Sequence, residues 1–242
     1  PFHPSRIFRK YYPYALRPLL YADMFRKKIY PDFWNEYADS FENGLPNLVL
    51  DNKFVVLDTE TTGFNVKEDR ILSVGALVLQ HQTIQPKQAF ELFMEQEYYS
   101  AETAKIHGIL KQGATDRITE LQGLKRILET LKNSVLVAHH TGYDVAMINN
   151  ALKRNGLPKL KNKSLDTASL YFKTVSKLKK EELESHISLD DLAKIYSISK
   201  KDRHTALGDA YITAIAFLHI LEKLKPATLN NLLKRDRLFC CL

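Results

Sequence analysis

The alternation of apolar and polar positions predicts an α/β domain from residue 52 onward. Apolar runs predict four strands, at residues 53–59, 70–79, 88–94 and 134–138. The first three follow one another closely, which indicates an antiparallel meander. A predicted helix at residues 144–153 follows the fourth strand, and such a crossover places that strand parallel to the first. The expected fold is a mixed β-sheet, an antiparallel meander plus parallel strands, flanked by helices.

Helical periodicity accounts for most of the remaining chain. Apolar residues spaced three and four apart predict helices at residues 101–106, 115–131 and 205–224. Ser188 and Asp191 have the spacing of a capping box, which predicts a helix that continues through Ile195. Pro226 ends the last long helix.

The first 47 residues differ from the rest, because aromatic and basic residues crowd there and prolines break the segment into short helical pieces. Basic and aromatic side chains can grip phosphates and stack on bases. The favoured alternative is that the aromatics pack this extension onto the main domain. A turn at residues 44–46 indicates the boundary. The predicted division is a helical extension at 1–47, a main domain at 48–225 and a basic helical tail at 226–242.

Composition narrows the class of protein. A chain of 242 residues can form one large core with an extension, and 45% hydrophobic with 26% charged residues is typical of a globular protein. No apolar run is long enough to span a bilayer, so no membrane partner is expected. The net charge of +7 suits a polyanionic partner. The two adjacent cysteines, Cys240 and Cys241, form neither a disulfide framework nor a zinc motif, which favours a cytoplasmic location.

The candidate chemistry begins where the first predicted strand ends. Asp58 and Glu60 are two residues apart, so they point to the same face of the strand. Buried together, two like charges would cost several kcal/mol, unless one carboxyl is protonated or a cation lies between them. Carboxylate oxygens select hard divalent cations, above all Mg²⁺ or Mn²⁺. The alternative is a strand end with two solvated acids.

Further ionisable groups follow other apolar elements. Asp144 comes after the strand at 134–138, and His204 and Asp209 open the last long helix. Strand ends and helix starts gather at one edge of such a sheet, so these groups can converge. Residues five apart on a helix do not share a face. We therefore expect His204 on the preceding loop, Thr205 as N-cap and Asp209 in the second turn.

Three segments together resemble a known family. They are residues 58–63 (DTETTG), 138–144 (AHHTGYD) and 204–210 (HTALGDA). Their order, spacing and contexts are similar to the three motifs of the DnaQ-like 3′–5′ exonucleases of the DEDDh type, which include the epsilon-type proofreading exonucleases of bacterial polymerases. The resemblance covers residues 52–224 and implies an RNase H-like fold.

The resemblance implies a site with two divalent cations. Asp58, Glu60, Asp144 and Asp209 would hold two Mg²⁺ or Mn²⁺ ions about 3.5–4 Å apart. His204 would be the general base that takes a proton from the attacking water, since free imidazole exchanges protons near neutral pH. The products would be 5′-mononucleotides released from a 3′ end.

The substrate contacts that we predict lie within these motifs, apart from His107. They involve Thr61, Thr62, Gly63, His107, His140 and Tyr143. A structural role as a C-cap contact is favoured for His107. His139 and His140 are expected to stabilise the fold or line the substrate, and the family usually has an amide at the position of His140. Asp166 is expected to cap a helix or support the site indirectly. A basic run at residues 153–180 is either a solvated face or an attraction for substrate phosphates.

The leading hypothesis is thus a metal-dependent exonuclease on single-stranded 3′ ends, with DNA favoured, acting alone or as a proofreader bound to a DNA polymerase. The alternatives are an exoribonuclease, an oligoribonuclease-like hydrolase of short RNA, or a non-catalytic module that binds nucleic acid or a polymerase. Retention of buried like charges argues against the last. The sequence does not determine the oligomeric state.

Overall fold

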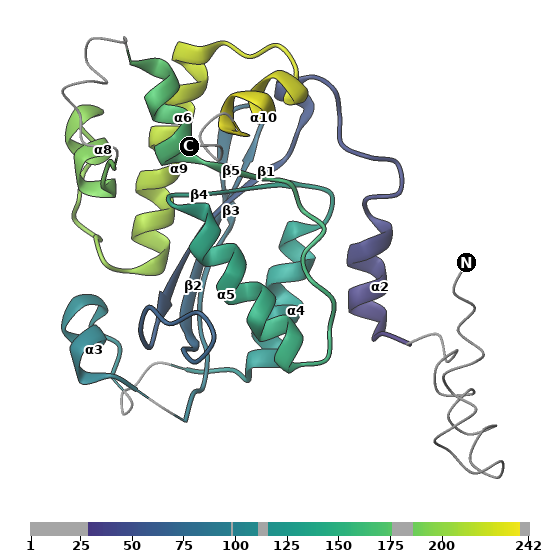
Figure 1. Cartoon of the computed structure of the whole chain (residues 1–242), viewed down its shortest axis with the longest axis vertical. Helices are drawn as coiled ribbons and strands as arrows, with labels where there is room; N and C mark the ends of the chain where they lie inside the picture. Colours follow the sequence, from purple (N-terminus) through teal and green to yellow (C-terminus); the bar gives the residue numbers. More distant parts are fainter. Residues whose placement is uncertain (1–28, 98, 111–115, 176–185, 238–242) are drawn as a thin grey trace, which may run out of the picture. The chain divides into compact units, whose positions relative to one another are not determined.

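The computed structural model describes residues 29–97, 99–110, 116–175 and 186–237. The described residues from Asp32 onward belong to one compact unit. In chain order the described elements of this unit are α2 (Asp32–Asp39), the 3₁₀ helix η3 (Val49–Asp51), β1 (Phe54–Thr61), β2 (Ile71–Gln80), β3 (Thr83–Phe93), α3 (Ala101–His107), α4 (Glu120–Leu131), β4 (Val135–Ala138), α5 (Thr141–Arg154), β5 (Ser164–Asp166), α6 (Thr167–Thr174), α8 (Leu189–Ile195), α9 (Ala206–Leu224) and α10 (Leu229–Arg237) (Figure 1).

The described strands form one mixed sheet in the order β3-β2-β1-β4-β5. β1, β2 and β3 pair antiparallel, whereas β4 runs parallel to β1 and β5 runs parallel to β4. This arrangement confirms the predicted meander and the predicted parallel strand. β2 is buried along nearly its whole length because it lies between two strands and under helices.

Helices cover both faces of the sheet (Figure 1). Phe54 and Val56 of β1 point to the face covered by α6 and α9, where they join a buried apolar cluster that includes Phe217. Figure 1 shows α4 and α5 on the other face. Side chains alternate along a strand, so neighbouring residues of β1 belong to different faces. This alternation decides which helix each residue of the candidate site can meet.

Several predicted boundaries are corrected. β1 continues to Thr61, two residues beyond the predicted end, so Glu60 as well as Asp58 lies inside the strand. β3 begins at Thr83 because an edge strand tolerates Pro86 and polar residues, here beside an irregularity in its pairing with β2. α4 begins only at Glu120.

The late start of α4 has a local cause. Thr119 and Gln122 form a capping box, and Ile118 pairs with Met94 as an isolated bridge, so the apolar spacing upstream of Thr119 does not extend the helix. The predicted capping box of Ser188 and Asp191 is confirmed. Residue 115, the first of the predicted helix, lies outside the described part.

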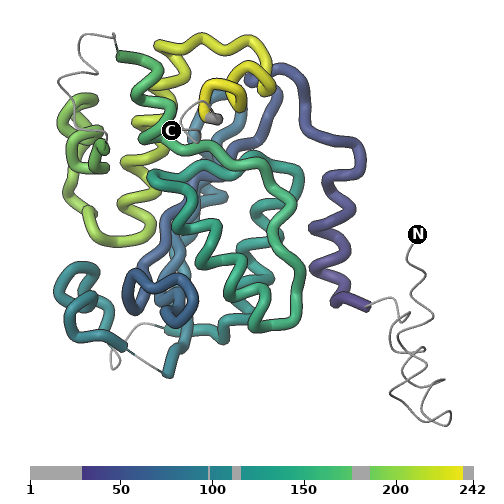
Figure 2. The backbone as a smooth tube through the Cα atoms, in the orientation of Figure 1, coloured from purple at the N-terminus to yellow at the C-terminus, as the bar shows by residue number. Residues whose placement is uncertain are grey.

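Packing joins the predicted terminal segments to the main domain. In α2, Trp34 and Tyr37 are buried, and the Tyr37 hydroxyl donates to Asn162 Oδ1 at 2.6 Å. At the other end, Leu232 of α10 belongs to the main core. Figure 2 shows this C-terminal segment beside the chain that leads into β1. The described residues on both sides of the boundaries expected after 47 and 225 therefore pack together. Most of the predicted extension, residues 1–28, lies outside the described part.

No helix in the described ranges is both long enough and apolar enough to cross a membrane. The two cysteines lie outside those ranges.

Gly75 of β2 allows α9 to reach the sheet. A Cβ atom at Gly75 would lie 2.1 Å from the Leu207 nitrogen and 2.2 Å from the Ala206 carbonyl carbon. Gly75 also pairs with Asp58 in the β1–β2 ladder. The first turn of α9 can therefore pack directly beside Asp58 only because position 75 has no side chain.

We predict that Gly75→Ala lowers the free energy of unfolding by about 2–3 kcal/mol, because the new methyl group meets backbone and not a flexible side chain. Urea denaturation measures this. The matched control is Gly142→Ala, where nothing lies within 4 Å of the added Cβ, and a change within about 1 kcal/mol is expected. Equal stability of the two variants would contradict the close approach.

Candidate active site

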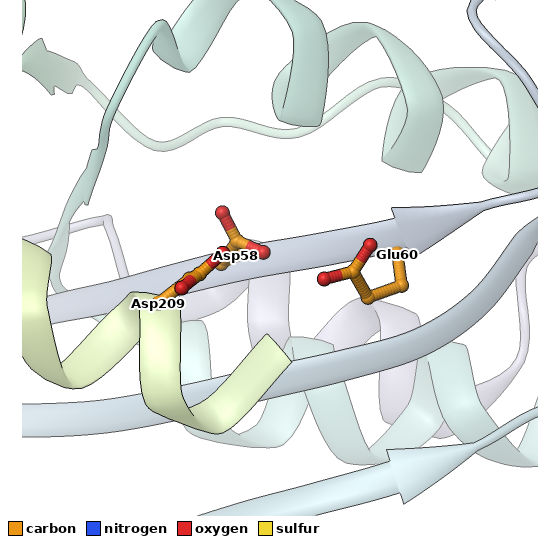
Figure 3. Close-up of side chains that lie close together, drawn as sticks. All are labelled: Asp58, Glu60 and Asp209. Carbon is orange, nitrogen blue, oxygen red and sulfur yellow. The ribbon is translucent and has the colours of Figure 1, made fainter. Parts of the chain in front are cut away.

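Three carboxylates from two distant parts of the chain meet at one place. Asp58 and Glu60 of β1 and Asp209 of α9 each present a potential ligand atom, and these atoms all lie within 4.8 Å of one another. Figure 3 shows the side chains of Asp58 and Asp209 close together, with the Glu60 carboxylate directed toward them. We call these three residues the acid cluster. The predicted same-face arrangement of Asp58 and Glu60 is thereby confirmed.

The start of α9 fixes the third member. Thr205 is the N-cap, as predicted, and its hydroxyl accepts a hydrogen bond from the Gly208 N–H at 3.1 Å. Asp209 lies in the first turn of the helix and not in the second turn that we expected. Gly208 is required as well, because a Cβ there would lie 1.9 Å from the Asp202 carbonyl oxygen.

Asp144 is not a member of the acid cluster but lies close enough for its charge to raise the pKa of Asp58. It is in the first turn of α5, is 4% exposed and accepts a hydrogen bond from the Thr59 hydroxyl at 2.7 Å. Thr59 and Asp58 point to opposite faces of the sheet by strand alternation. The structure thus brings three of the four predicted ligands into one group and holds the fourth beside it.

His204 lies on the loop before α9, as predicted. Its side chain is exposed, and its backbone has a φ of 68°, in the left-handed region. The backbone N–H donates to Asp209 Oδ1 at 3.3 Å, and Nδ1 lies 3.4 Å from Arg203 Nη1. A non-glycine residue in this region carries strain that the surrounding contacts must hold, and such strain is frequent at functional sites.

The segment after Glu60 forms a bonded turn. The Thr61 hydroxyl donates to the Gly63 carbonyl at 2.9 Å, and Thr62 donates to Asp69 Oδ1 at 2.6 Å. The Tyr143 hydroxyl lies 2.7 Å from both the Thr61 hydroxyl and the Gly63 carbonyl oxygen. The side chains of Thr61 and Thr62 are thus used within the protein, and any contact they make to a ligand would compete with these bonds.

The predicted structural role of His107 is confirmed. It ends α3, and its Nδ1 accepts a hydrogen bond from the Ile109 N–H at 3.0 Å, while Gly108 provides the left-handed C-cap. Its other ring nitrogen, Nε2, is buried, and the Thr61 backbone lies near enough to the ring to oppose the effect of burial on its pKa. Burial lowers the pKa of His107, which favours the neutral ring.

His139 stabilises the fold. Its two ring nitrogens bond Thr167 Oγ1 and the Ile187 carbonyl, and burial lowers its pKa to about 3, so the ring is neutral. His140 is the N-cap of α5 with a φ of 58°, and its ring stacks on that of His186 at 4.5 Å. Asp166 caps α6 and accepts the His140 N–H at 3.1 Å, which confirms the expected capping role.

Two lysines in the described part of the basic run lie away from the acid cluster. Lys159 and Lys163 are exposed in the segment that leads into the N-terminal end of β5. The candidate residues lie toward the C-terminal ends of β1 and β4, and β5 runs in the same direction as these two strands. These lysines therefore do not line the cluster. Residues 176–180 of the run lie outside the described part.

The sequence profile of one family, described as exonuclease, matches residues 55–217. The chain belongs to the RNase T exonuclease family. The matched region contains the acid cluster, Asp144 and His204. The predicted DnaQ-like, DEDDh-type assignment is confirmed.

Curated relatives of this exonuclease domain include polymerase components. It is 33% identical over 183 residues to a PolC-type DNA polymerase III of Caldanaerobacter subterraneus, covering 75% of the chain but only 12% of that protein. It is 31% identical over 177 residues to DNA polymerase III subunit epsilon of Aquifex aeolicus, covering 73% of the chain and 84% of the relative.

Solved structures with a similar fold include Escherichia coli exonuclease I in complex with a dT13 oligonucleotide. The TM-score is 0.62 at 18% identity, over 72% of this chain and 42% of that one. Cell-death related nuclease 4 (CRN-4) has a TM-score of 0.59 at 10% identity, over 72% of this chain and 64% of that one. At these identities the likeness shows the fold, which is RNase H-like as predicted.

The acid cluster has a strong excess of negative charge. Burial, and then the charges of Asp144, Asp209 and Glu60, raise the pKa of Asp58 well above its usual range. Burial raises the pKa of Glu60 to about 7, with a further increase from Asp209. Burial also raises the pKa of Asp144 to about 7, against the opposing effect of the Thr59 hydroxyl. These shifts express first the cost of burying charged carboxyl groups and then, for Asp58 and Glu60, the cost of placing like charges together.

A divalent cation fits this donor set. Three carboxylate oxygen donors at this spacing are hard ligands of the kind that divalent cations of the Mg²⁺ and Mn²⁺ class prefer. The raised pKa values show that the group would gain from a positive partner.

Sequence reasoning missed two residues that organise the site. Thr59 lies between Asp58 and Glu60 but serves Asp144. Arg203 precedes the predicted histidine and forms an ion pair with Asp209. A polar residue at a strand position facing the core was the available signal for Thr59, whereas an arginine on a loop gave no comparable signal.

Stability should depend on pH through these carboxyls. A carboxyl whose pKa is higher in the folded state binds its proton more tightly there, so the free energy of unfolding falls as pH rises from about 4.5 to about 7. With divalent cations removed by chelator, we expect Glu60→Gln to reduce this fall by about 2–3 kcal/mol, as measured by chemical denaturation at about pH 5 and pH 8. Exposed Glu102→Gln is the control and should follow the wild type. The same pH slope in both variants would contradict the prediction.

Thr59→Val keeps a β-branched side chain but removes the donor to Asp144. We expect it to destabilise the protein by about 1–3 kcal/mol near pH 8 and by less near pH 5, where Asp144 is protonated. The matched control is Thr213→Val, because the buried Thr213 hydroxyl has no hydrogen-bond partner among the described residues, and no loss is expected there. A double-mutant cycle with Asp144→Ala measures the coupling, and a coupling energy near zero would contradict the assigned bond.

Proposed function

We propose that this chain is a metal-dependent 3′–5′ exonuclease that hydrolyses phosphodiester bonds at the 3′ ends of single-stranded DNA and releases 5′-mononucleotides. The observation that carries the proposal is the acid cluster, in which Asp58, Glu60 and Asp209 converge from β1 and α9. Membership of the exonuclease family supports the reaction class.

In this proposal the chain holds two divalent cations. Asp58, Glu60, Asp209 and Asp144 are the residues that would hold them. Such cations polarise the phosphate and acidify the attacking water. Thr59 keeps Asp144 in place through the hydroxyl bond at 2.7 Å.

His204 is proposed as the general base. Its backbone is tied to Asp209, while its exposed ring is free to face a substrate. Arg203 Nη1 can only donate to Nδ1, so while this 3.4 Å contact is kept the neutral ring carries its proton on Nε2. The ring must leave Arg203, with its proton on Nδ1, before Nε2 can take the proton from the attacking water. The contacts of Thr61, Thr62, Gly63, His107, His140 and Tyr143 to the terminal nucleotide stay predictions, and for Thr61 and Thr62 the backbone is the available part.

The names of the relatives support the choice of substrate and partner. The E. coli exonuclease I structure contains a dT13 oligonucleotide, and the Aquifex relative is named as a DNA polymerase III subunit. We propose single-stranded DNA as substrate and a DNA polymerase as a partner. The chain covers 12% of the Caldanaerobacter polymerase, so a role as the proofreading part of a larger assembly is included in this proposal. The functional division at residues 1–47, 48–225 and 226–242 and the cytoplasmic location stay predictions.

The test is a nuclease assay on an oligonucleotide labelled at its 5′ end. With Mg²⁺ or Mn²⁺, the wild type should shorten single-stranded DNA from the 3′ end, and Asp58→Ala should lower the rate by about a thousandfold or more, since a ligand to the cations is lost. His204→Ala should lower it about 100-fold to 10,000-fold. Glu129→Ala, on the exposed face of α4, is the control and should leave the rate unchanged.

The substrate preference is tested by matched DNA, RNA and duplex oligonucleotides. Faster hydrolysis of RNA would overturn the choice of DNA and favour the exoribonuclease alternative. Persistent activity in Asp58→Ala would overturn the proposed site, and nucleic-acid binding without any release of mononucleotides would favour the non-catalytic module.

A further inference from the structure

Arg203 is held between two helices by two acids. Its Nη1 forms an ion pair with Asp209 Oδ2, and its Nη2 forms another with Asp190 Oδ2 of α8 at 3.1 Å. The Arg203 side chain is 19% exposed, Asp209 is 7% exposed and Asp190 is 43% exposed. The guanidinium therefore reaches from a surface acid into the buried acid cluster.

Both oxygens of Asp209 already have partners within the protein. Arg203 bonds Oδ2, and the His204 N–H donates to Oδ1 at 3.3 Å. The positive charge of Arg203 also lowers the pKa of Asp58, Glu60 and Asp209 against the effect of burial. Arg203 is thus a counter-charge for the whole cluster and a direct partner of one member.

A guanidinium and a divalent cation cannot both bind fully to one carboxylate. They seek the same lone pairs, and as like charges in a partly buried place they repel each other. Asp190 is a second ion-pair partner of the guanidinium, so Arg203 can lose its ion pair with Asp209 and still remain paired. Lys200 pairs with the same Asp190, at 3.0 Å, but makes no contact with the cluster in the described structure.

We infer that Arg203 competes with divalent cations for the Asp209 carboxylate and so sets the affinity of the acid cluster for these cations. When a cation binds, the guanidinium keeps its ion pair with Asp190. This inference rests on the proposed function, because it assumes that the acid cluster binds divalent cations. Arg203 acts through Asp209 and is a regulating and positioning residue, not a catalytic one.

The test is equilibrium binding of Mn²⁺ to the purified chain, followed by electron paramagnetic resonance of the free ion. We expect Arg203→Ala to lower the dissociation constant of the Asp58-dependent site on the order of tenfold, because both the competitor and its repulsion are removed. Lys200→Ala is the matched control, since it also removes a cation from Asp190, and it should change the dissociation constant less than about twofold. An unchanged or weakened affinity in Arg203→Ala overturns the inference.

A second variant should change the Mn²⁺ affinity in the opposite direction. Asp190→Asn removes the second ion-pair partner of Arg203, so the guanidinium stays paired with Asp209. Mn²⁺ should therefore bind more weakly than to the wild type. In an Arg203→Ala background the same Asp190 substitution should have little effect, because no guanidinium remains to be redirected. An equal effect of Asp190→Asn in both backgrounds overturns the inference.

Thermal unfolding gives a readout that does not depend on catalysis. With chelator, Arg203→Ala should melt at a lower temperature than the wild type because the cluster loses its counter-charge, and Mn²⁺ should raise its melting temperature by more. If Arg203→Ala does not fold, Arg203→Lys decides in its place: a single ammonium cannot bridge both acids, so Mn²⁺ affinity should again rise, and no change overturns the inference.

The outcomes separate the two proposals. Asp58-dependent Mn²⁺ binding and nuclease activity in the wild type, with no tightening in Arg203→Ala, overturn only the role of Arg203. Absence of any Asp58-dependent Mn²⁺ binding in the wild type overturns the proposed function, and the inference with it.

Discussion

Three carboxylates that repel one another are the constraint on which this structure depends. Potential ligand atoms of Asp58, Glu60 and Asp209 lie within 4.8 Å of one another, although burial raises the pKa of each and repulsion from neighbouring acids raises the pKa of Asp58 and Glu60 further. The apolar core must supply the free energy that keeps them there. β1 is buried on both faces up to Leu57, and α9 packs along β1 and β2 through residues such as Phe217. The acids are therefore carried on the most firmly packed elements, which is what precise positioning of like charges requires.

Close approach between the backbones of β2 and α9 positions the residues of the site. Gly75 lies opposite Asp58 in the ladder and lets the first turn of α9 pack on β2, and Gly208 lets the loop before α9 fold back onto it. The Leu207 N–H donates a hydrogen bond to Glu91 Oε1 of β3 at 3.3 Å. These contacts act on the same short stretch of chain, which carries His204 and Asp209. Gly208, the glycine of the third motif, is therefore required because a side chain there would clash with the backbone, and not because the loop must be flexible.

The sequence predicted those features that depend on local periodicity or on a short motif. The same-face placement of Asp58 and Glu60 follows from strand alternation, and Thr205 and Ser188 were recognisable as caps. β5 and α6 could not be predicted in this way, since a strand of three residues followed directly by a helix leaves no periodic signal. The position of Asp144 also depends on tertiary structure: the motif named the residue, but only the packing of α5 across the sheet from α9 shows that it pairs with Thr59. The pairing of Arg203 with two acids on different helices had no local signature at all.

Charge explains why an acidic site can serve a polyanionic substrate. The chain as a whole is basic, with a net charge of +7, which favours approach of a nucleic acid over long range. At short range the acid cluster opposes a phosphodiester, because it would add further negative charge to a group whose members already hold their protons too tightly. Arg203 offsets one charge through Asp209, which is not enough for three carboxylates and a phosphate. Divalent cations offset more and also bind phosphate oxygens directly. The same repulsion that makes the cluster costly to fold therefore makes productive contact with a phosphate depend on the cations, and this links the stability of the site to its selectivity.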